Sequence, residues 1–197
     1  MRRSTCVVAS VFLVSLLGSG LATGQVNDQN EVKNARSSAS DVFLFGTQTP
    51  IVPASSTLTR TVRGGSMTVS TSGLIPDNVY TNWWLVFNHP EHCGATPCGL
   101  SDFANSKVQG SVLWATGRVA DGQGQATFDA HLAPSAPEGV VLFGPGLINP
   151  LTAEVHIAVR WHGAIGANGD SLQDQLTMIN GGCAVACTNV QVAIHLP

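Results

Sequence analysis

Residues 79–98 read VYTNWWLVFNHPEHCGATPC: a strongly β-forming run, then a proline, then a short loop between two cysteines. From 79 to 87 nearly every residue is β-branched, aromatic or large and apolar, the composition that suits the pleated, half-buried surface of a sheet. We therefore predict that residues 79–88 form a central β-strand and that the rest of the fold is built around it.

Alternation along this strand divides its side chains between two faces of the sheet. One face carries Val79, Trp83, Leu85 and Phe87, and the other carries Tyr80, Asn82, Trp84 and Val86. The first face is the more apolar, so we expect it to face the core and Trp83 to be buried. Trp84 then lies on a mixed face, where it is either covered by the chain's own loops or exposed as a platform for a sugar or a protein partner.

The rest of the chain alternates short apolar runs with Gly, Pro, Asn and Asp turns and shows no helical period. Further strands are expected at 42–46, 57–63, 66–72, 108–119, 124–132, 139–143, 153–162 and 188–196, and a short helical turn at 171–176. The turn at 120–124 is expected to close a hairpin. Short strands with a turn about every ten residues favour an all-β fold, an antiparallel β-sandwich of about eight or nine strands or a barrel.

Three late strands alternate cleanly enough to assign their faces. The residues expected to face solvent are Gln125, Thr127, Asp129 and His131 at 124–132, Glu154, His156, Arg160 and His162 at 153–162, and Asn189, Gln191 and His195 at 188–196. The residues expected to face inward are Ala126, Phe128, Ala130 and Leu132, then Val155, Ile157, Val159 and Trp161, then Val190, Val192, Ile194 and Leu196. One wet face on each strand is typical of antiparallel sheets.

The first 24 residues have the layout of a secretory signal peptide: Arg2 and Arg3, an apolar run at 6–17 and a small-residue end at 22–24. The apolar run is too short to span a bilayer comfortably, and no second long run follows it. We predict cleavage near Gly24, a flexible polar tail at 25–40 and one domain at 41–197. The mature protein is expected to be secreted or periplasmic, without a membrane span.

The net charge of the mature chain makes nucleic acids and membrane surfaces unfavourable as partners. Once Arg2 and Arg3 are removed, seven Lys and Arg remain of nine, against twelve Asp and Glu, which gives a formal charge of −5. The basic residues are scattered and form no patch that could follow a phosphate backbone. We therefore expect no nucleic acid and no membrane surface as a partner.

Four cysteines remain after the signal peptide, and they fall into two close pairs. Cys93 lies near Cys98, and Cys183 lies near Cys187. Outside the cytosol such clustering indicates disulfides. Four cysteines allow three pairings, and we expect the two local ones because each pair brackets a short loop. Short loops give modest entropic stabilisation, so these bonds are expected mainly to fix loop shape.

The histidines on the predicted strands are candidate metal ligands. His156 and His162 share a face but stand roughly 20 Å apart along the strand, so they cannot bind one ion. A site would need one of them beside His131 or His195 on a neighbouring strand. Imidazole suits copper and zinc. The alternative is that these are ordinary surface histidines.

A second group follows the central strand at His89-Pro90-Glu91-His92-Cys93. Loops that leave a rigid strand are frequent functional sites, and His89 and His92 could form a two-histidine metal site there. A thiolate ligand and a disulfide exclude each other, so Cys93 is not expected to join them. The alternative is a turn fixed by Pro90 and the disulfide.

Other chemistry is harder to build from this sequence. There is no G-x-S-x-G nucleophile motif, and the Gly-rich turns precede no helix that could cradle a phosphate. A glycosidase needs two carboxylates at a fixed separation. The acidic residues are few and dispersed, so the sequence identifies no such pair, and Asp129 and Glu154, both on outward faces, come nearest to one. Arg160, beside Glu154 on the same face, could recognise an anionic or sugar ligand or form a cross-strand row of ion pairs.

Three segments carry a resemblance: YTNWWLVFN at 80–88, GSVLWATGRV at 110–119 and AEVHIAVRWHG at 153–163. They resemble a group of secreted bacterial proteins of uncharacterised activity. This resemblance covers about residues 66–197 and implies a β-sandwich and export, but no activity. More loosely, the arrangement is similar to the sandwiches of the chordin-repeat and copper/zinc superoxide dismutase classes. The dismutase class uses a His-x-His pair, and this chain has none.

Two functional hypotheses follow. The first is a secreted, non-enzymatic β-sandwich without a cofactor that binds a glycan or a protein partner, with Trp84, Arg160 and Glu154 as candidate contacts. The second is a copper- or zinc-dependent extracellular enzyme, oxidoreductase-like, that uses the histidines. The sequence leaves open whether the protein is an enzyme.

Overall fold

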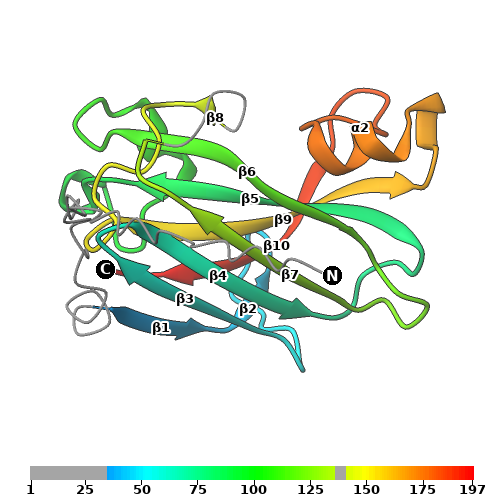
Figure 1. The fold of residues 1–197 in the computed structure, drawn as a ribbon, viewed down its shortest axis with the longest axis horizontal. Helices are drawn as coiled ribbons and strands as arrows, with labels where there is room; N and C mark the ends of the chain where they lie inside the picture. Colours follow the sequence, from blue (N-terminus) through cyan, green and yellow to red (C-terminus); the bar gives the residue numbers. More distant parts are fainter. Residues whose placement is uncertain (1–34, 136–140) are drawn as a thin grey trace, which may run out of the picture.

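Two antiparallel sheets pack face to face in the computed structural model (Figure 1), which describes residues 35–135 and 141–197. The four-stranded sheet has the order β1 (Arg36–Ser40), β3 (Ser55–Thr61), β4 (Gly64–Thr71) and β7 (Ala126–Leu132). The six-stranded sheet has the order β2 (Val42–Leu44), β10 (Thr188–His195), β9 (Glu154–Ala164), β5 (Asn78–Phe87), β6 (Gly110–Val119) and β8 (Val141–Phe143). The predicted all-β sandwich is confirmed.

Strand β5 occupies the position predicted for it. It pairs with β9 on one side and with β6 on the other, so it lies inside the six-stranded sheet. The predicted helical turn is confirmed as α2 (Leu172–Thr177), whose first turn is capped by the Ser171 hydroxyl accepting a hydrogen bond from the Asp174 amide. Short 3-10 turns add η1 (Pro90–His92), η2 (Leu100–Ala104) and η3 (Ala167–Gly169).

Residues 36–40 form a strand and not the end of a flexible tail. The whole of β1 pairs with β3, from Arg36 opposite Arg60 to Ser40 opposite Ser56. The Ser38 hydroxyl also lies 2.9 Å from Nδ1 of His195. Backbone pairing and polar contacts therefore anchor this edge strand. Its low apolar content had predicted a flexible tail, because apolar burial is not what holds it. The predicted signal peptide, the rest of the tail at 25–34 and residues 139–140 of the predicted strand 139–143 lie outside the described residues.

The turn at 120–124 does not close a hairpin, because β6 and β7 belong to different sheets. Asp121 holds the turn by accepting hydrogen bonds from the amides of Gln123 and Gln125. Gly124 has a φ of 71° and packs against the Leu74 carbonyl, where a side chain would overlap. The turn thus carries the chain from one sheet to the other, which corrects the prediction.

The two faces of β5 are the reverse of the prediction. Tyr80, Trp84 and Val86 join the main core, and Trp84 is only 2% exposed. Trp83 lies on the opposite face, yet it is 5% exposed. Both faces of this central strand are covered, so the greater apolarity of one face did not reveal which one meets the other sheet. Trp84 is therefore no exposed platform for a sugar or a partner.

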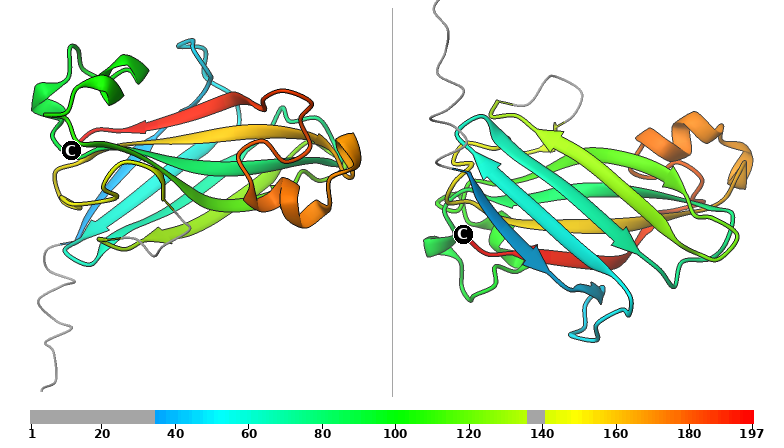
Figure 2. Two further views of the ribbon diagram at one scale, coloured as in Figure 1. Left: turned by 90° about the horizontal axis from the view of Figure 1, so that it is seen from above. Right: turned by 60° about the horizontal axis from the view of Figure 1, so that its bottom comes forward.

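The covers lie over the outer face of the six-stranded sheet, at opposite ends of the molecule (Figure 2). At one end, the segment with η1 and η2 covers a second apolar cluster, in which the rings of Phe87 and Phe103 stand 4.7 Å apart. At the other end α2 packs on β6. The Trp114 indole donates to the Leu176 carbonyl, and Gly117 leaves room for Leu176 to approach the strand.

Candidate functional sites

The polar row of β9 points away from the core as predicted, but it does not face solvent. Glu154 is 1% exposed and His162 is 0% exposed, and His156 is buried as well. The alternation of apolar and polar residues correctly assigned the two faces of the strand. The prediction of a wet face is wrong because the two covers fold over it.

Glu154 and His156 hold the first cover on the sheet. Oε1 of Glu154 accepts a hydrogen bond of 2.7 Å from the Cys98 amide and one of 2.6 Å from Nε2 of His156. The imidazole also packs against the Phe87 ring, with centroids 5.0 Å apart. Both polar groups are thus occupied by the fold, and Glu154 is not available as a ligand contact. Asp129, the other half of the possible glycosidase pair, lies on the outer face of the four-stranded sheet.

The predicted disulfides are confirmed as Cys93–Cys98 and Cys183–Cys187. In the first loop, the Asp102 carboxylate accepts hydrogen bonds from the amides of Gly94 (2.9 Å) and Gly99 (2.7 Å). These two backbone donors lower the pKa of the Asp102 carboxyl. The carboxylate therefore stays ionised within 4.8 Å of both sulfurs of this disulfide.

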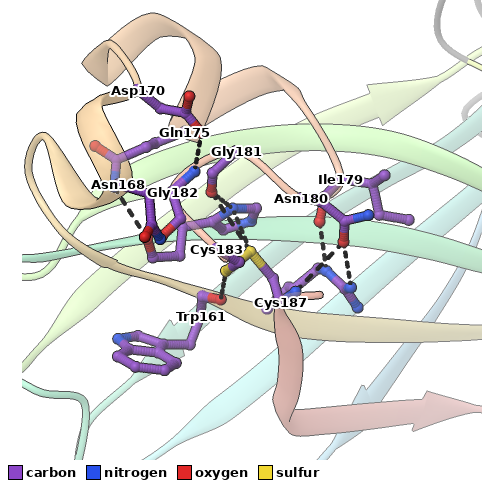
Figure 3. The surroundings of a disulfide bond; sticks show 12 residues. Trp161, Asn168, Asp170, Gln175, Ile179, Asn180, Gly181, Gly182, Cys183 and Cys187 are labelled. Carbon is purple, nitrogen blue, oxygen red and sulfur yellow. Dashed lines mark hydrogen bonds between the residues drawn. A yellow bond between two sulfur atoms is a disulfide. The ribbon is translucent and has the colours of Figure 1, made fainter. Parts of the chain in front are cut away.

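Figure 3 shows the surroundings of the second disulfide. Its Cys187 sulfur lies against the ring of the buried His162. Nδ1 of His162 is 2.7 Å from the Gly181 carbonyl oxygen and 3.3 Å from Sγ of Cys187, and Nε2 is 2.7 Å from Oγ1 of Thr81. Burial lowers the pKa of His162, so the ring is neutral at neutral pH. Because a carbonyl oxygen only accepts, the single ring proton resides on Nδ1, and Nε2 accepts from the Thr81 hydroxyl.

Polar side chains around this disulfide fix its loop to the connection that follows β9 and to β9 itself (Figure 3). Asn168 donates to the Gly182 carbonyl, and Asp170 accepts from the Gly182 amide, each at 2.7 Å. The Arg160 guanidinium donates to the Ile179 carbonyl at 2.7 Å. Arg160, a predicted ligand contact, is therefore engaged in holding the loop.

His195 points between the sheets and not to solvent. Its Nε2 lies 2.8 Å from the Ser56 hydroxyl, and Arg60 donates to its carbonyl. Burial, the Arg60 charge and the His156 ring lower the pKa of His195 to about 4. A β-bulge between Asn189 and Gln191 reverses the alternation of β10, which turns Gln191, Ala193 and His195 inward and corrects the predicted faces.

The structure does not bring the candidate metal ligands together. His131 lies on the exposed outer face of the four-stranded sheet, 2.9 Å from the Ser66 hydroxyl, while His156 and His195 lie on opposite faces of the other sheet. His89 bonds to Glu91, and its ring centroid is 6.3 Å from that of His92. Among the described residues, the groups of three or more possible ligand atoms within 4.8 Å are His162–Cys183–Cys187 and Cys93–Cys98–Asp102. In both groups the sulfurs are joined as disulfides.

The outer face of the four-stranded sheet carries a surface that the sequence reasoning missed, which we call the hydroxyl face. The register aligns three rows across its strands: Ser37, Thr59, Ser66 and His131; Thr57, Thr68 and Asp129; and Ser55, Ser70 and Thr127. Within the rows, side-chain hydrogen bonds join β1 to β3 and β4 to β7, as between Thr68 and Asp129 at 2.7 Å. The signal was the alternation of hydroxyl residues in SSTLTRT and GGSMTVST.

A pocket of about 610 Å³ adjoins this face. The row of Ser55, Ser70 and Thr127 forms part of its wall, and residues 50–54 add an apolar side. Asp41, Thr71, Gln125 and Ala126 complete the lining. Among the described residues, none hydrogen-bonds to the carboxylate of Asp41 or to the side-chain amide of Gln125, so both groups are available to a ligand.

Comparison of the chain with protein-family models, curated proteins and solved structures gives no significant match. Within residues 35–135 and 141–197, no helix has the length and apolarity needed to cross a bilayer. The function is therefore inferred from the geometry of the chain itself.

Proposed function

We propose that the protein is an exported binding module that recognises a neutral glycan through the hydroxyl face and the adjoining pocket. The observation that carries this proposal is their continuity. Ser55, Ser70 and Thr127 belong to both surfaces. The pocket adds a carboxylate and an amide that no described residue engages.

The chemistry of this surface matches that of sugars. Hydroxyl, amide and carboxylate groups together offer donors and acceptors, which a chain of sugar hydroxyls can satisfy. Side chains on one face of a sheet repeat about every 6.8 Å along a strand and about every 4.8 Å between strands. A repeating ligand can therefore make the same kind of contact several times.

The same surface is poorly suited to the other partners considered. Protein interfaces concentrate aromatic, methionine and arginine side chains at their centre and are depleted in serine, whereas the hydroxyl face consists of Ser and Thr with Asp129 and His131. The carboxylates of Asp129 and Asp41 disfavour an anionic sugar. The two disulfides are typical of proteins outside the cytosol, where exposed polysaccharides are found.

The test is retention of the purified chain by insoluble cellulose, chitin and β-1,3-glucan, and affinity electrophoresis in soluble xylan and starch. Binding to at least one of these neutral glycans is expected. Gln125→Ala and Asp41→Asn should each weaken it by about 2- to 12-fold, the cost of one lost hydrogen bond. Gln173→Ala, on exposed α2 far from the pocket, is the matched control and should bind normally.

Two outcomes would overturn the proposal. One is the absence of binding to every neutral glycan of the panel. The other is a glycan that binds equally well to the pocket variants and to Gln173→Ala, because contact would then lie elsewhere on the chain.

A further inference from the structure

The two disulfides are built alike in one respect. In each, the first cysteine is partly exposed, and the second is 4% exposed: Cys93 before Cys98, and Cys183 before Cys187. An external thiolate must reach a sulfur atom to attack it. The more exposed cysteine of each pair, Cys93 or Cys183, is therefore the more accessible to attack, which makes Cys98 and Cys187 the leaving groups.

The two leaving sulfurs differ in their surroundings. Sγ of Cys187 lies 3.3 Å from Nδ1 of His162, the ring nitrogen that carries the proton. In the intact disulfide this N–H donates to the Gly181 carbonyl at 2.7 Å, and a thiolate formed at Cys187 would share it. Thr81 holds the ring in place, since its hydroxyl donates to Nε2 and accepts from the Trp83 indole at 2.8 Å. A stabilised thiolate is a better leaving group.

At Cys98 the corresponding neighbours oppose ionisation. Each leaving sulfur has a carbonyl oxygen nearby that cannot donate a hydrogen bond, Pro90 at 3.9 Å from Cys98 and Gly181 at 3.4 Å from Cys187. Among the contacts of the described residues, no ring N–H comparable to that of His162 lies beside Cys98. The ionised Asp102 carboxylate is within 4.8 Å of both sulfurs, and a like charge disfavours a thiolate. The first disulfide is thus expected to resist opening.

We propose that Cys183–Cys187 is a site of thiol–disulfide exchange with an external thiol, and that His162 stabilises the leaving thiolate. The thiolate of the external reagent attacks Sγ of Cys183 and forms a mixed disulfide with it. The Cys183–Cys187 bond breaks, and Cys187 leaves with the electron pair as a thiolate. This thiolate accepts a hydrogen bond from Nδ1–H of His162.

The substrate class is a thiol, and a dithiol completes the reaction. Its second thiolate attacks the external sulfur of the mixed disulfide and releases Cys183 as a thiolate. The dithiol leaves as its own disulfide, so two electrons have passed from it to the protein. The two protons of the dithiol end on Cys183 and Cys187 or in solvent.

The test uses the native full chain with dithiothreitol near pH 7, quenched at intervals with iodoacetamide. Peptide mass spectrometry then gives the rate at which each disulfide opens. Cys183–Cys187 should open at least about tenfold faster than Cys93–Cys98. In a parallel sample treated with glutathione in place of dithiothreitol, glutathione should be found as a mixed disulfide on Cys183. In urea, where the surroundings of both bonds are lost, the two rates should converge. Equal native rates, or an unchanged ratio in urea, would overturn the proposal.

Two variants assign the cause. His162→Leu, checked for folding by circular dichroism, removes the N–H donor beside Cys187 and should bring the ratio of rates close to one. Asp102→Asn, the matched change in the other loop, should speed the opening of Cys93–Cys98 and leave the other bond unaffected. A folded His162→Leu protein that keeps the native ratio would refute the role of His162. If the His162→Leu protein does not fold, an Asp102→Asn protein in which Cys93–Cys98 opens no faster would contradict the proposed difference between the two disulfides.

Discussion

The outer faces of the two sheets differ in what covers them, although both come from alternating apolar and polar residues. On the six-stranded sheet, the polar groups of Glu154 and His162 are buried and hold covering loops in place. On the four-stranded sheet, Thr57, Thr68 and Asp129 remain exposed. A polar side chain on a strand therefore indicates a face, but only the packing of distant loops decides whether it stabilises the fold or meets a ligand.

The largest expected effect on the free energy of unfolding comes from emptying the core between the sheets, and it should exceed the effect of emptying a site under the outer cover. Trp84→Ala should lower the free energy of unfolding by about 3–5 kcal/mol, because it empties a large site in the main core. Trp83→Ala should cost less than Trp84→Ala, because the cover on its face is a short helix and loops that can partly collapse. Urea unfolding of both variants measures this difference. A larger loss for Trp83→Ala would mean that the cover is as tightly determined as the core.

The polar contacts between the sheets should appear as a dependence of stability on pH. The pKa of His195 is about 4 in the folded chain, below the ordinary histidine value of 6.5, because of burial first and the Arg60 charge second. Its contribution is fully present above pH 6.5 and is lost as the pH falls toward 4, since only the unfolded chain is protonated in that window. The full loss is about 3 kcal/mol.

His195→Asn is the variant that isolates this contribution. It keeps a polar side chain beside Ser56 but cannot take up a proton, so its stability should fall less steeply between pH 6.5 and 4 than that of the wild type. Urea unfolding at half-unit intervals of pH gives both slopes. Parallel slopes would show that His195 is not the group responsible.

Much of the fold could be predicted because it depends on local patterns. The density of β-branched and aromatic residues located β5, and the spacing of the cysteines gave both disulfides. The faces of β7 were also correct, with Phe128 buried and His131 exposed. In each case the determinant lies within about ten residues of the chain.

The remaining features depend on contacts between distant segments. A bulge near Asn189 turned His195 inward, and no residue pattern within β10 indicates it. The burial of His162 depends on the loop at 181–187, and the rows of the hydroxyl face depend on the register of four strands. The metal site predicted from residue type alone was therefore misplaced. Of the four strand histidines predicted to face solvent, His156, His162 and His195 are buried by the fold, and His131 is exposed.

A smaller effect compares matched carboxylates on the two faces. Glu154→Gln removes a buried charge that accepts from the Cys98 amide and from His156, and it should cost about 1–3 kcal/mol. Asp129→Asn alters one exposed hydrogen bond with Thr68 and should change stability by less than about 0.5 kcal/mol. Urea unfolding gives both values, and hydrogen exchange at the Cys98 amide should rise only in the first variant. Similar losses of stability in the two variants would contradict the contrast between the covered outer face of the six-stranded sheet and the exposed hydroxyl face.

The smallest expected change in stability comes from a variant that tests directly whether the hydroxyl face binds the ligand. Thr57 and Thr68 are cross-strand partners on the hydroxyl face, and replacing both by valine keeps their shape and their preference for strands. The free energy of unfolding should stay within about 0.5 kcal/mol of the wild type, while binding to the retained glycan should weaken. A loss of stability above about 1 kcal/mol would make these hydroxyls structural. Unchanged stability with weaker binding would show that the fold does not need them and that the ligand does.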